Sequence, residues 1–174
     1  MKIAFYILLA FVVVAVVVLA PRMRKDIKKK LQFENTFAIQ NVATGKALRP
    51  LNAQYENGVE LISYPIQNWE CITWEFIEID ANTFLLKDLF TEKTFQPKSE
   101  PKDGVGLWQQ SLGGTPLQHW EFLKQADESY LIRLKGTELY LTASADETNS
   151  PILLKPKSDD KKQFWKKVRQ NPWI

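Results

Sequence analysis

Apolar and polar residues alternate in three short segments of the chain, and each of these segments precedes a tryptophan. The apolar residues lie two apart, as Val59 and Leu61, Val105 and Leu107, and Ile152 and Leu154. This alternation is typical of a strand with one buried face. The tryptophans that follow are Trp74, Trp120 and Trp165, at steps of 46 and 45 residues. A fixed step of this size indicates an internal repeat.

Two further strands are predicted upstream of each apolar pair. Their sequences are FAIQNV and KALRPL, then TFLLKD and KTFQP, then SYLIRL and ELYLTA. Every unit therefore has the order strand, turn, strand, polar loop, strand, long loop, tryptophan strand. We expect three units of about four strands each, over residues 33–79, 80–125 and 126–170. No stretch after Lys30 has the 3.6-residue apolar period of a helix.

The number of repeats decides between architectures. Blades of a propeller also have four strands, but three blades cannot close a ring of the usual four to eight. The chain resembles the ricin B-chain lectin family, whose mark is a Gln-x-Trp in each of three units. It matches at Gln118-His119-Trp120 and at Gln163-Phe164-Trp165, and the first unit has Ile72-Thr73-Trp74. The resemblance implies an all-β fold, a β-trefoil of three ~45-residue repeats over residues 33–174 with the three tryptophans in its interior.

The resemblance also implies where a sugar would bind. In this family an aspartate, an aromatic ring and an amide from each unit hold the ligand. The aspartate position falls on Arg49, Gln96 and Thr142, the aromatic position on Ile62, Trp108 and Lys155, and the amide position on Cys71, Leu117 and Lys162. Only the second unit keeps a ring, so the predicted carbohydrate-binding residues are Trp108, Gln96, Gln109 and Gln110.

Two alternatives to this site stay open. One is that Trp108 is a strand-end residue half covered by the loop SLGGTPL. The other is that Tyr64 or Trp69, from the long loop of the first unit, supplies the ring instead.

The first thirty residues have a different character. Residues 3–20 carry no charge, and a helix of that length spans most of a hydrocarbon core. We expect residues 1–20 to form one N-terminal transmembrane helix, a signal anchor, and residues 21–32 a basic juxtamembrane linker. Six Lys or Arg residues follow the apolar segment and only Lys2 precedes it, which favours a single-pass protein with a cytoplasmic trefoil. The alternative is a signal peptide cleaved after Ala20, which would leave a secreted protein.

Charge and composition narrow the function. The formal net charge is +3, but residues 1–30 hold seven Lys or Arg and one acid, leaving 16 bases and 19 acids in residues 31–174. A folded part without a basic face argues against nucleic acid as a partner. The single cysteine, Cys71, cannot form an internal disulfide, so the core alone must hold the domain together.

The sequence does not favour catalysis. A nucleophile, a base and an orienting group must lie within reach of one another, and the chain offers one histidine, His119. We predict no catalytic residues, no metal and no cofactor. The predicted function is a membrane-anchored ricin B-type lectin domain that binds carbohydrate. The alternative is a β-trefoil that has lost sugar binding and acts as a protein-interaction module at the membrane.

Overall fold

The computed structural model describes residues 33–172, which contain twelve strands and four short 3₁₀ turns. In the first unit the strands are β1 (Thr36–Asn41), β2 (Lys46–Pro50), β3 (Leu61–Pro65) and β4 (Thr73–Asp80). In the second they are β5 (Thr83–Asp88), β6 (Thr94–Pro97), β7 (Leu107–Gln110) and β8 (His119–Lys124). In the third they are β9 (Tyr130–Leu134), β10 (Leu139–Ala143), β11 (Ile152–Pro156) and β12 (Phe164–Arg169). The predicted three units of four strands are confirmed.

Six of the strands close a barrel. The first and last strands of the units pair in the antiparallel order β1, β4, β5, β8, β9, β12, and β12 returns to pair with β1. A closed ring leaves no free edge among these six strands, so their ladders are satisfied without a partner chain.

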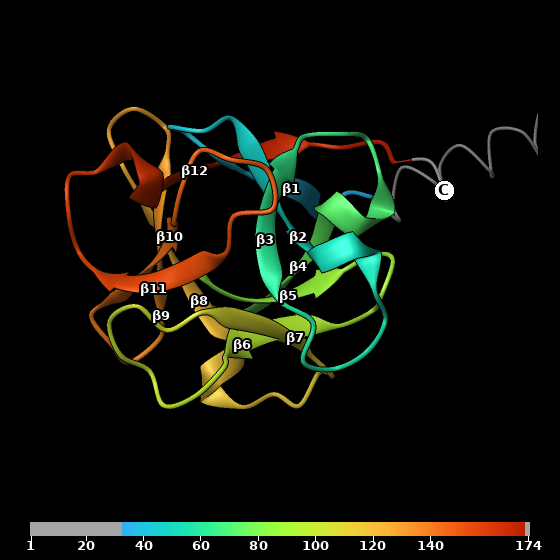
Figure 1. Cartoon of the computed structure of the whole chain (residues 1–174), viewed down its shortest axis with the longest axis horizontal. Coiled ribbons are helices and arrows are strands. Elements are labelled where there is room, and N and C mark those ends of the chain that lie inside the picture. The colour runs from blue at the N-terminus through green and yellow to red at the C-terminus, as the bar shows by residue number, and fades with distance from the viewer. Residues whose placement is uncertain (1–32, 173–174) are drawn as a thin grey trace, which may run out of the picture. The chain divides into compact units, whose positions relative to one another are not determined.

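The other six strands form three hairpins, β2–β3, β6–β7 and β10–β11. Figure 1 shows β3, β7 and β11 converging on one end of the barrel. Single bridges join each hairpin to the next, at Glu60–Trp108, Gly106–Leu153 and Ile62–Pro151. Six barrel strands capped by three joined hairpins make a β-trefoil.

The pairing registers define which residues are equivalent under the threefold repeat. The last residue of each first strand lies opposite a tryptophan, as Asn41 opposite Trp165, Asp88 opposite Trp74, and Leu134 opposite Trp120. Each unit's tryptophan strand therefore pairs with the first strand of the next unit. The tryptophan strand of the third unit pairs with the first strand of the first unit, and this pairing closes the barrel.

The three tryptophans fill the barrel, as the sequence predicts. Their exposed fractions are 1% for Trp74, 0% for Trp120 and 1% for Trp165. The Phe95 ring lies between two of them, with its centroid 5.2 Å from the Trp74 ring and 4.9 Å from the Trp120 ring. Burying an indole of about 200 Å² at about 25 cal/mol/Å² contributes roughly 5 kcal/mol, which is large for a domain without a disulfide.

The three indoles differ in their hydrogen bonds. Trp74 Nε1 donates to the Leu48 carbonyl at 3.1 Å, and Trp165 Nε1 donates to the Leu141 carbonyl at 2.9 Å. The buried Nε1 of Trp120 has no acceptor among the residues described. The repeat therefore preserves the ring at all three positions but the hydrogen bond at only two.

The chain divides into two units, Met1–Glu34 and Asn35–Ile174, and the second contains the trefoil. The transmembrane helix predicted over residues 1–20 and the linker predicted over residues 21–32 lie outside the described residues. Within residues 33–172 no helix is long and apolar enough to cross a bilayer.

The unequal indole bonds lead to a first prediction. Trp165→Phe removes a donor and leaves the buried Leu141 carbonyl without its partner, whereas Trp120→Phe removes a donor that has no acceptor. Both substitutions leave a similar cavity. We expect Trp165→Phe to lower the free energy of unfolding by about 1 kcal/mol more than Trp120→Phe does, measured by urea denaturation.

Trp74→Phe is the matched control, because it also removes a satisfied donor. It should behave like Trp165→Phe. Equal destabilisation by all three substitutions would show that the indole hydrogen bonds contribute nothing to stability.

Candidate functional site

The glutamines of the two Gln-x-Trp motifs hold the long loops against the trefoil. Gln118 Nε2 donates to Gln96 Oε1 at 2.9 Å and to the Ser111 carbonyl at 3.0 Å, and Gln118 Oε1 accepts from the Gly113 amide at 2.9 Å. Gln118 is 2% exposed. Its amide group thus ties the loop after β7 to strand β6.

Gln163 repeats this arrangement in the third unit. Its Nε2 donates to Thr142 Oγ1 at 3.1 Å and to the Pro156 carbonyl at 2.7 Å, and its Oε1 accepts from the Ser158 amide at 2.8 Å. Gln96 and Thr142 are the residues at the family's aspartate position. In this chain both accept a hydrogen bond from the motif glutamine. Residues at this position therefore help to hold the long loop in place.

The first unit lacks the motif glutamine, and its residue at the family's aspartate position is a buried arginine. Arg49 is 7% exposed, and its Nε donates to the Pro50 carbonyl at 3.1 Å. Its guanidinium carbon lies 4.3 Å from the centroid of the Tyr64 ring, and the Tyr64 and Trp69 rings are 6.2 Å apart. Arg49 therefore covers one face of Tyr64, which leaves that face closed to a sugar.

The second unit presents a half-buried ring, Trp108 of β7. Trp108 lies opposite Gln96 of β6 on one side and opposite Glu60 on the other. Directly opposed residues of antiparallel strands share a face, so these three side chains form one row across the two hairpins. Gln110, two residues further along β7, lies on the same face.

Glu60 was not among the residues predicted from the sequence. Its carboxylate forms an ion pair with the ammonium of Lys98, and both side chains are about one third exposed. Glu60 is the middle residue of the first apolar pair, where the other units have Gly106 and Leu153. The sequence signal for Glu60 is its place between two apolar residues that face inward. Because side chains alternate along a strand, the residue between them must face outward.

Gln109 lies on the opposite face of β7 from Trp108, and it is 1% exposed. Its Nε2 donates to the Gln54 and Glu56 carbonyls, both at 2.9 Å, and its Oε1 accepts from Thr91 Oγ1 at 2.8 Å. Every polar atom of this side chain is used inside the protein. Gln109 therefore fixes the loop after β2 and is not available to a ligand.

A buried carboxyl group lies behind Gln109. Asp88 is fully buried, and its Oδ1 accepts from the Thr91 amide at 2.8 Å and the Phe90 amide at 3.1 Å. Its Oδ2 has no hydrogen-bond partner among the residues described. Burial raises the pKa of Asp88 to about 7, against the lowering effect of these hydrogen bonds and of the nearby Arg49.

The threefold repeat explains the unpaired oxygen of Asp88. The equivalent Asn41 accepts from the Ala43 and Thr44 amides through Oδ1, as Asp88 does from its own loop, and donates through Nδ2 to the Lys162 and Phe164 carbonyls. The Phe164 carbonyl also accepts from Val42, and the Thr73 carbonyl accepts from Leu89 in the same way. Asp88 Oδ2 thus occupies the place of the Asn41 Nδ2 donor. Asp88 can donate a hydrogen bond from this place only when its carboxyl group is protonated.

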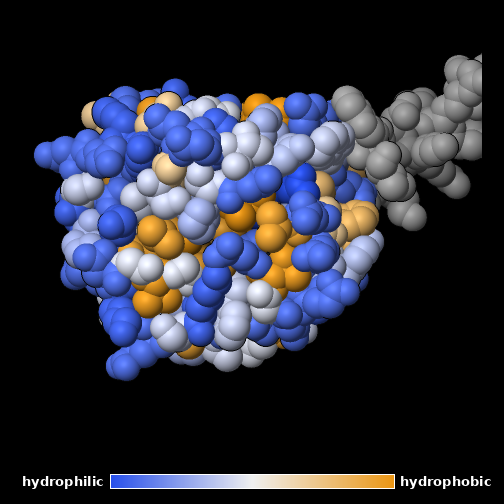
Figure 2. Space-filling view, viewed as in Figure 1, coloured by the Kyte–Doolittle hydropathy of each residue, from blue (hydrophilic) through white to orange (hydrophobic). Residues whose placement is uncertain are grey.

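On the surface of the trefoil, Figure 2 shows apolar side chains in separate patches, with polar side chains between them, on the face that carries β3, β7 and β11. The one histidine, His119, is half-buried at the start of β8. Among residues 33–172 no three side chains of His, Cys, Asp or Glu gather into a possible metal site.

Known proteins were compared with this chain by sequence and by structure. No family model and no curated protein sequence matches it. The designed threefold-symmetric protein ThreeFoil superposes with a TM-score of 0.74 at 19% identity, over 77% of this chain and 98% of that one. A Macrolepiota procera ricin B-like lectin superposes with a TM-score of 0.67 at 19% identity, over 77% and 94%. The predicted ricin B-like β-trefoil fold is confirmed.

The same fold also occurs as part of a larger enzyme. The exo-β-1,3-galactanase of Clostridium thermocellum superposes with a TM-score of 0.71 at 21% identity, over 78% of this chain but 30% of that one. A shared fold leaves the chemistry to be argued from the site.

The geometry of Asp88 generates a prediction on pH. The folded protein holds the Asp88 proton up to about pH 7, whereas the unfolded chain releases it near the ordinary value of 3.8. Stability from this group is therefore present at pH 3.8 and below and is lost as the pH rises to 7, by at most about 4 kcal/mol. Asp88→Asn restores the donor without a charge, and it should abolish that loss.

The measurement is the free energy of unfolding between pH 4.5 and 8 for the wild type and Asp88→Asn. The two should agree most closely at the acid end, and the variant should be the more stable at pH 8. Asp159→Asn, which changes an exposed carboxyl, is the control and should follow the wild type. Parallel curves for the wild type and Asp88→Asn would show that Asp88 is ionised in the folded protein.

Proposed function

We propose that the trefoil is a non-catalytic carbohydrate-binding module with one site, on the second unit. The observation that carries this proposal is the row formed by Gln96, Trp108 and Glu60 across two joined hairpins. It brings an aromatic ring, an amide and a carboxylate onto one face. These are the groups that sugar recognition requires.

Each group has a distinct role in the proposed site. The Trp108 ring offers an apolar surface on which the carbon face of a sugar stacks. Glu60 accepts hydrogen bonds from hydroxyl groups, and an ionised acceptor makes hydrogen bonds about twice as strong as a neutral one does. Gln96 Oε1 is occupied by Gln118, so Gln96 contributes only its Nε2 donors. Lys98 and Gln110 add donors at the margin of the row.

Glu60 changes the chemistry expected of the second unit. The family's aspartate position holds Gln96, and a site built from neutral amides alone would be poor at binding hydroxyl groups. Glu60 supplies a carboxylate from the neighbouring unit instead. The Macrolepiota procera lectin, which shares the fold, was solved in complex with lactose, and this supports a sugar as the ligand class here.

A second function is favoured by a different observation. The indole Nε1 of Trp108 is buried and has no partner among the described residues, and in the first unit the buried Arg49 covers one face of Tyr64. These features fit a trefoil that has lost sugar binding and acts as a protein-interaction module. The binding experiment below separates the two functions.

We also propose that residues 1–20 anchor the protein in a membrane as a single-pass helix and that residues 21–32 form a basic linker. The proposal rests on the uncharged segment 3–20 and on the six basic residues that follow it. The charge distribution favours a cytoplasmic trefoil. Cleavage after Ala20, giving a secreted lectin, is the alternative.

The binding site gives the third prediction. We expect the protein to bind glycans with a Kd of about 1 mM, near −4 kcal/mol, because the site offers one ring and one carboxylate. Trp108→Ala should weaken binding at least tenfold, and Glu60→Gln should weaken it less, because the amide oxygen remains an acceptor. Glycan-array screening followed by NMR titration of the best ligand would measure both effects.

Trp69→Ala is the matched control, because it removes a half-buried ring from the first unit. Binding should survive in this variant. Loss of binding in Trp69→Ala with retention in Trp108→Ala would move the site to the first unit. Absence of binding to every glycan would favour the protein-interaction module.

The orientation gives the fourth prediction. A reporter enzyme that is active only outside the cytoplasmic membrane, fused after Ile174, should be inactive, whereas a cytoplasmic reporter at the same place should be active. The reverse result would overturn the orientation. A mature protein that begins after Ala20 would overturn the anchor.

A further inference from the structure

One lysine takes the place of a core aromatic residue in the barrel. The residue two positions after each tryptophan points to the same side as the indole, and in the first two units it is Phe76 and Phe122. In the third unit it is Lys167. The registers confirm the equivalence, since Phe76, Phe122 and Lys167 lie opposite Leu86, Ile132 and Ile39, each two residues before the end of a first strand.

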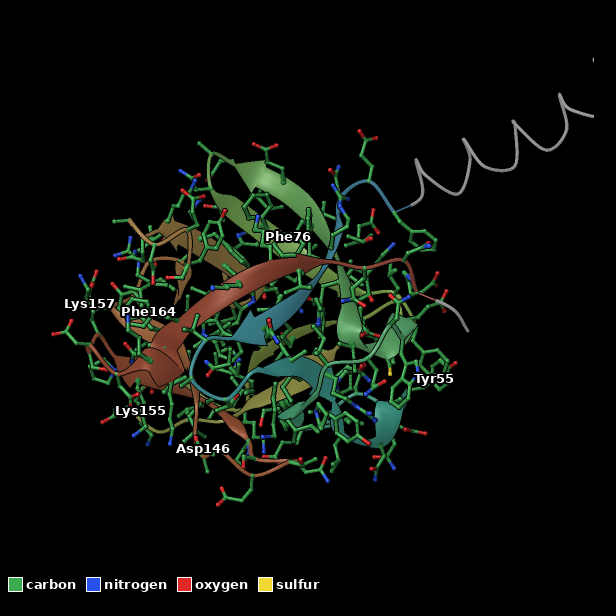
Figure 3. All side chains as sticks on the ribbon, turned by 90° about the horizontal axis from the view of Figure 1, so that it is seen from above. Tyr55, Phe76, Asp146, Lys155, Lys157 and Phe164 are labelled. Carbon is green, nitrogen blue, oxygen red and sulfur yellow. The ribbon has the colours of Figure 1, made fainter. Side chains whose placement is uncertain are left out.

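Five aromatic rings surround the ammonium of Lys167, and we call them the barrel-end cage. The distances from Lys167 Nζ to their centroids are 4.3 Å for Phe76, 4.6 Å for Phe84, 4.8 Å for Phe122, 5.3 Å for Tyr130 and 5.8 Å for Phe37. The rings come from five different strands. In Figure 3 the labelled Phe76 lies beside β12, the strand that carries Lys167.

Among residues 33–172 the amine of Lys167 has no hydrogen-bond acceptor. No carboxylate, carbonyl or hydroxyl group of these residues bonds to Nζ, and the five ring faces lie around it. A second cation, Arg169, lies over the Phe37 ring of the cage, with its guanidinium carbon 4.7 Å from the centroid. Burial lowers the pKa of Lys167 to about 8. When this amine loses its proton, no donor group among the described residues holds its lone pair.

The cage is also accessible. Lys167 and the rings of Phe37, Phe84 and Tyr130 are each half-buried, so this end of the barrel reaches the surface. Lys166, the preceding residue, points the other way and is exposed, so it serves as an internal control.

We propose that Lys167 is a covalent binding site for small aldehydes. The neutral amine attacks the carbonyl carbon, a C–N bond forms, and the carbonyl oxygen leaves as water after proton transfer. The product is an imine, which is protonated to an iminium. No oxidant or reductant is needed, and hydrolysis reverses the reaction.

The cage selects this chemistry over acylation. An iminium keeps a positive charge on the nitrogen, so it keeps the cation–π contacts with the five rings. An acyl group would convert the nitrogen to a neutral amide, whose N–H and C=O would lie against ring faces without partners. A desolvated lysine in an apolar setting is also the usual form of an imine-forming amine.

The test uses the full-length protein and propanal with cyanoborohydride, which reduces the imine to a stable secondary amine. Peptide mass spectrometry measures the rate of labelling at each lysine. At pH 7, Lys167 should be labelled at least about tenfold faster than Lys166, because about a tenth of it is neutral. The rate at Lys167 should rise with a midpoint near pH 8. Equal or slower labelling of Lys167 would overturn the proposal.

Two further comparisons separate reactivity from folding. Lys166→Met should retain the fast labelling, and Lys167→Met should lose it. If Lys167→Met fails to fold, labelling in the wild type and in Lys166→Met still decides the question. Alkylation at Lys167 should leave the melting temperature nearly unchanged, whereas acetylation there should lower it. Equal effects of the two modifications would show that the cage does not discriminate between an amine and an amide.

Discussion

Three indole rings packed inside a closed barrel are the constraint from which the rest of the structure follows. Six strands form the ring, and each tryptophan lies opposite the last residue of a first strand. A barrel of this size must be filled by side chains, and three large rings at equivalent positions fill it evenly. A one-residue shift in the register of a tryptophan strand would turn its indole to the solvent, whereas the loops absorb the one-residue difference between the spacings of 46 and 45.

Packing of the barrel requires the three tryptophans but allows the residues beside them to differ between units. Opposite the tryptophans the units have Asn41, Asp88 and Leu134, which are a donor, an acid and an apolar group. Two residues after the tryptophans they have Phe76, Phe122 and Lys167. Asp88 and Lys167 are ionisable where the other two units have neutral residues, and they carry the predicted pH dependence and the proposed reactive amine. The symmetric positions account for stability, and the asymmetric ones account for chemistry.

The sequence was sufficient to predict the fold, because apolar alternation and tryptophan spacing report directly on which residues face the core. The site was predicted less well. Trp108 and Gln96 do lie together, but Gln109 shares the inward face of β7 with Leu107 and is buried. The two-residue alternation along a strand already predicts that Gln109, like Leu107, faces inward. The pairing of Glu60 with Trp108 joins residues of different units, and no local pattern specifies it.

The contribution of Glu60 also explains why the proposed site lies on one unit only. At the Glu60–Trp108 bridge the middle residue of one apolar pair faces the ring position of the next hairpin, so this site needs an acid from one unit and a ring from the following one. Glu60 and Trp108 satisfy this condition. At the next bridge Gly106 faces Leu153, which is the middle residue of the third pair and not its ring position, Lys155. A binding site in this trefoil is therefore a property of two neighbouring units, and changing one hairpin alone could not transfer it.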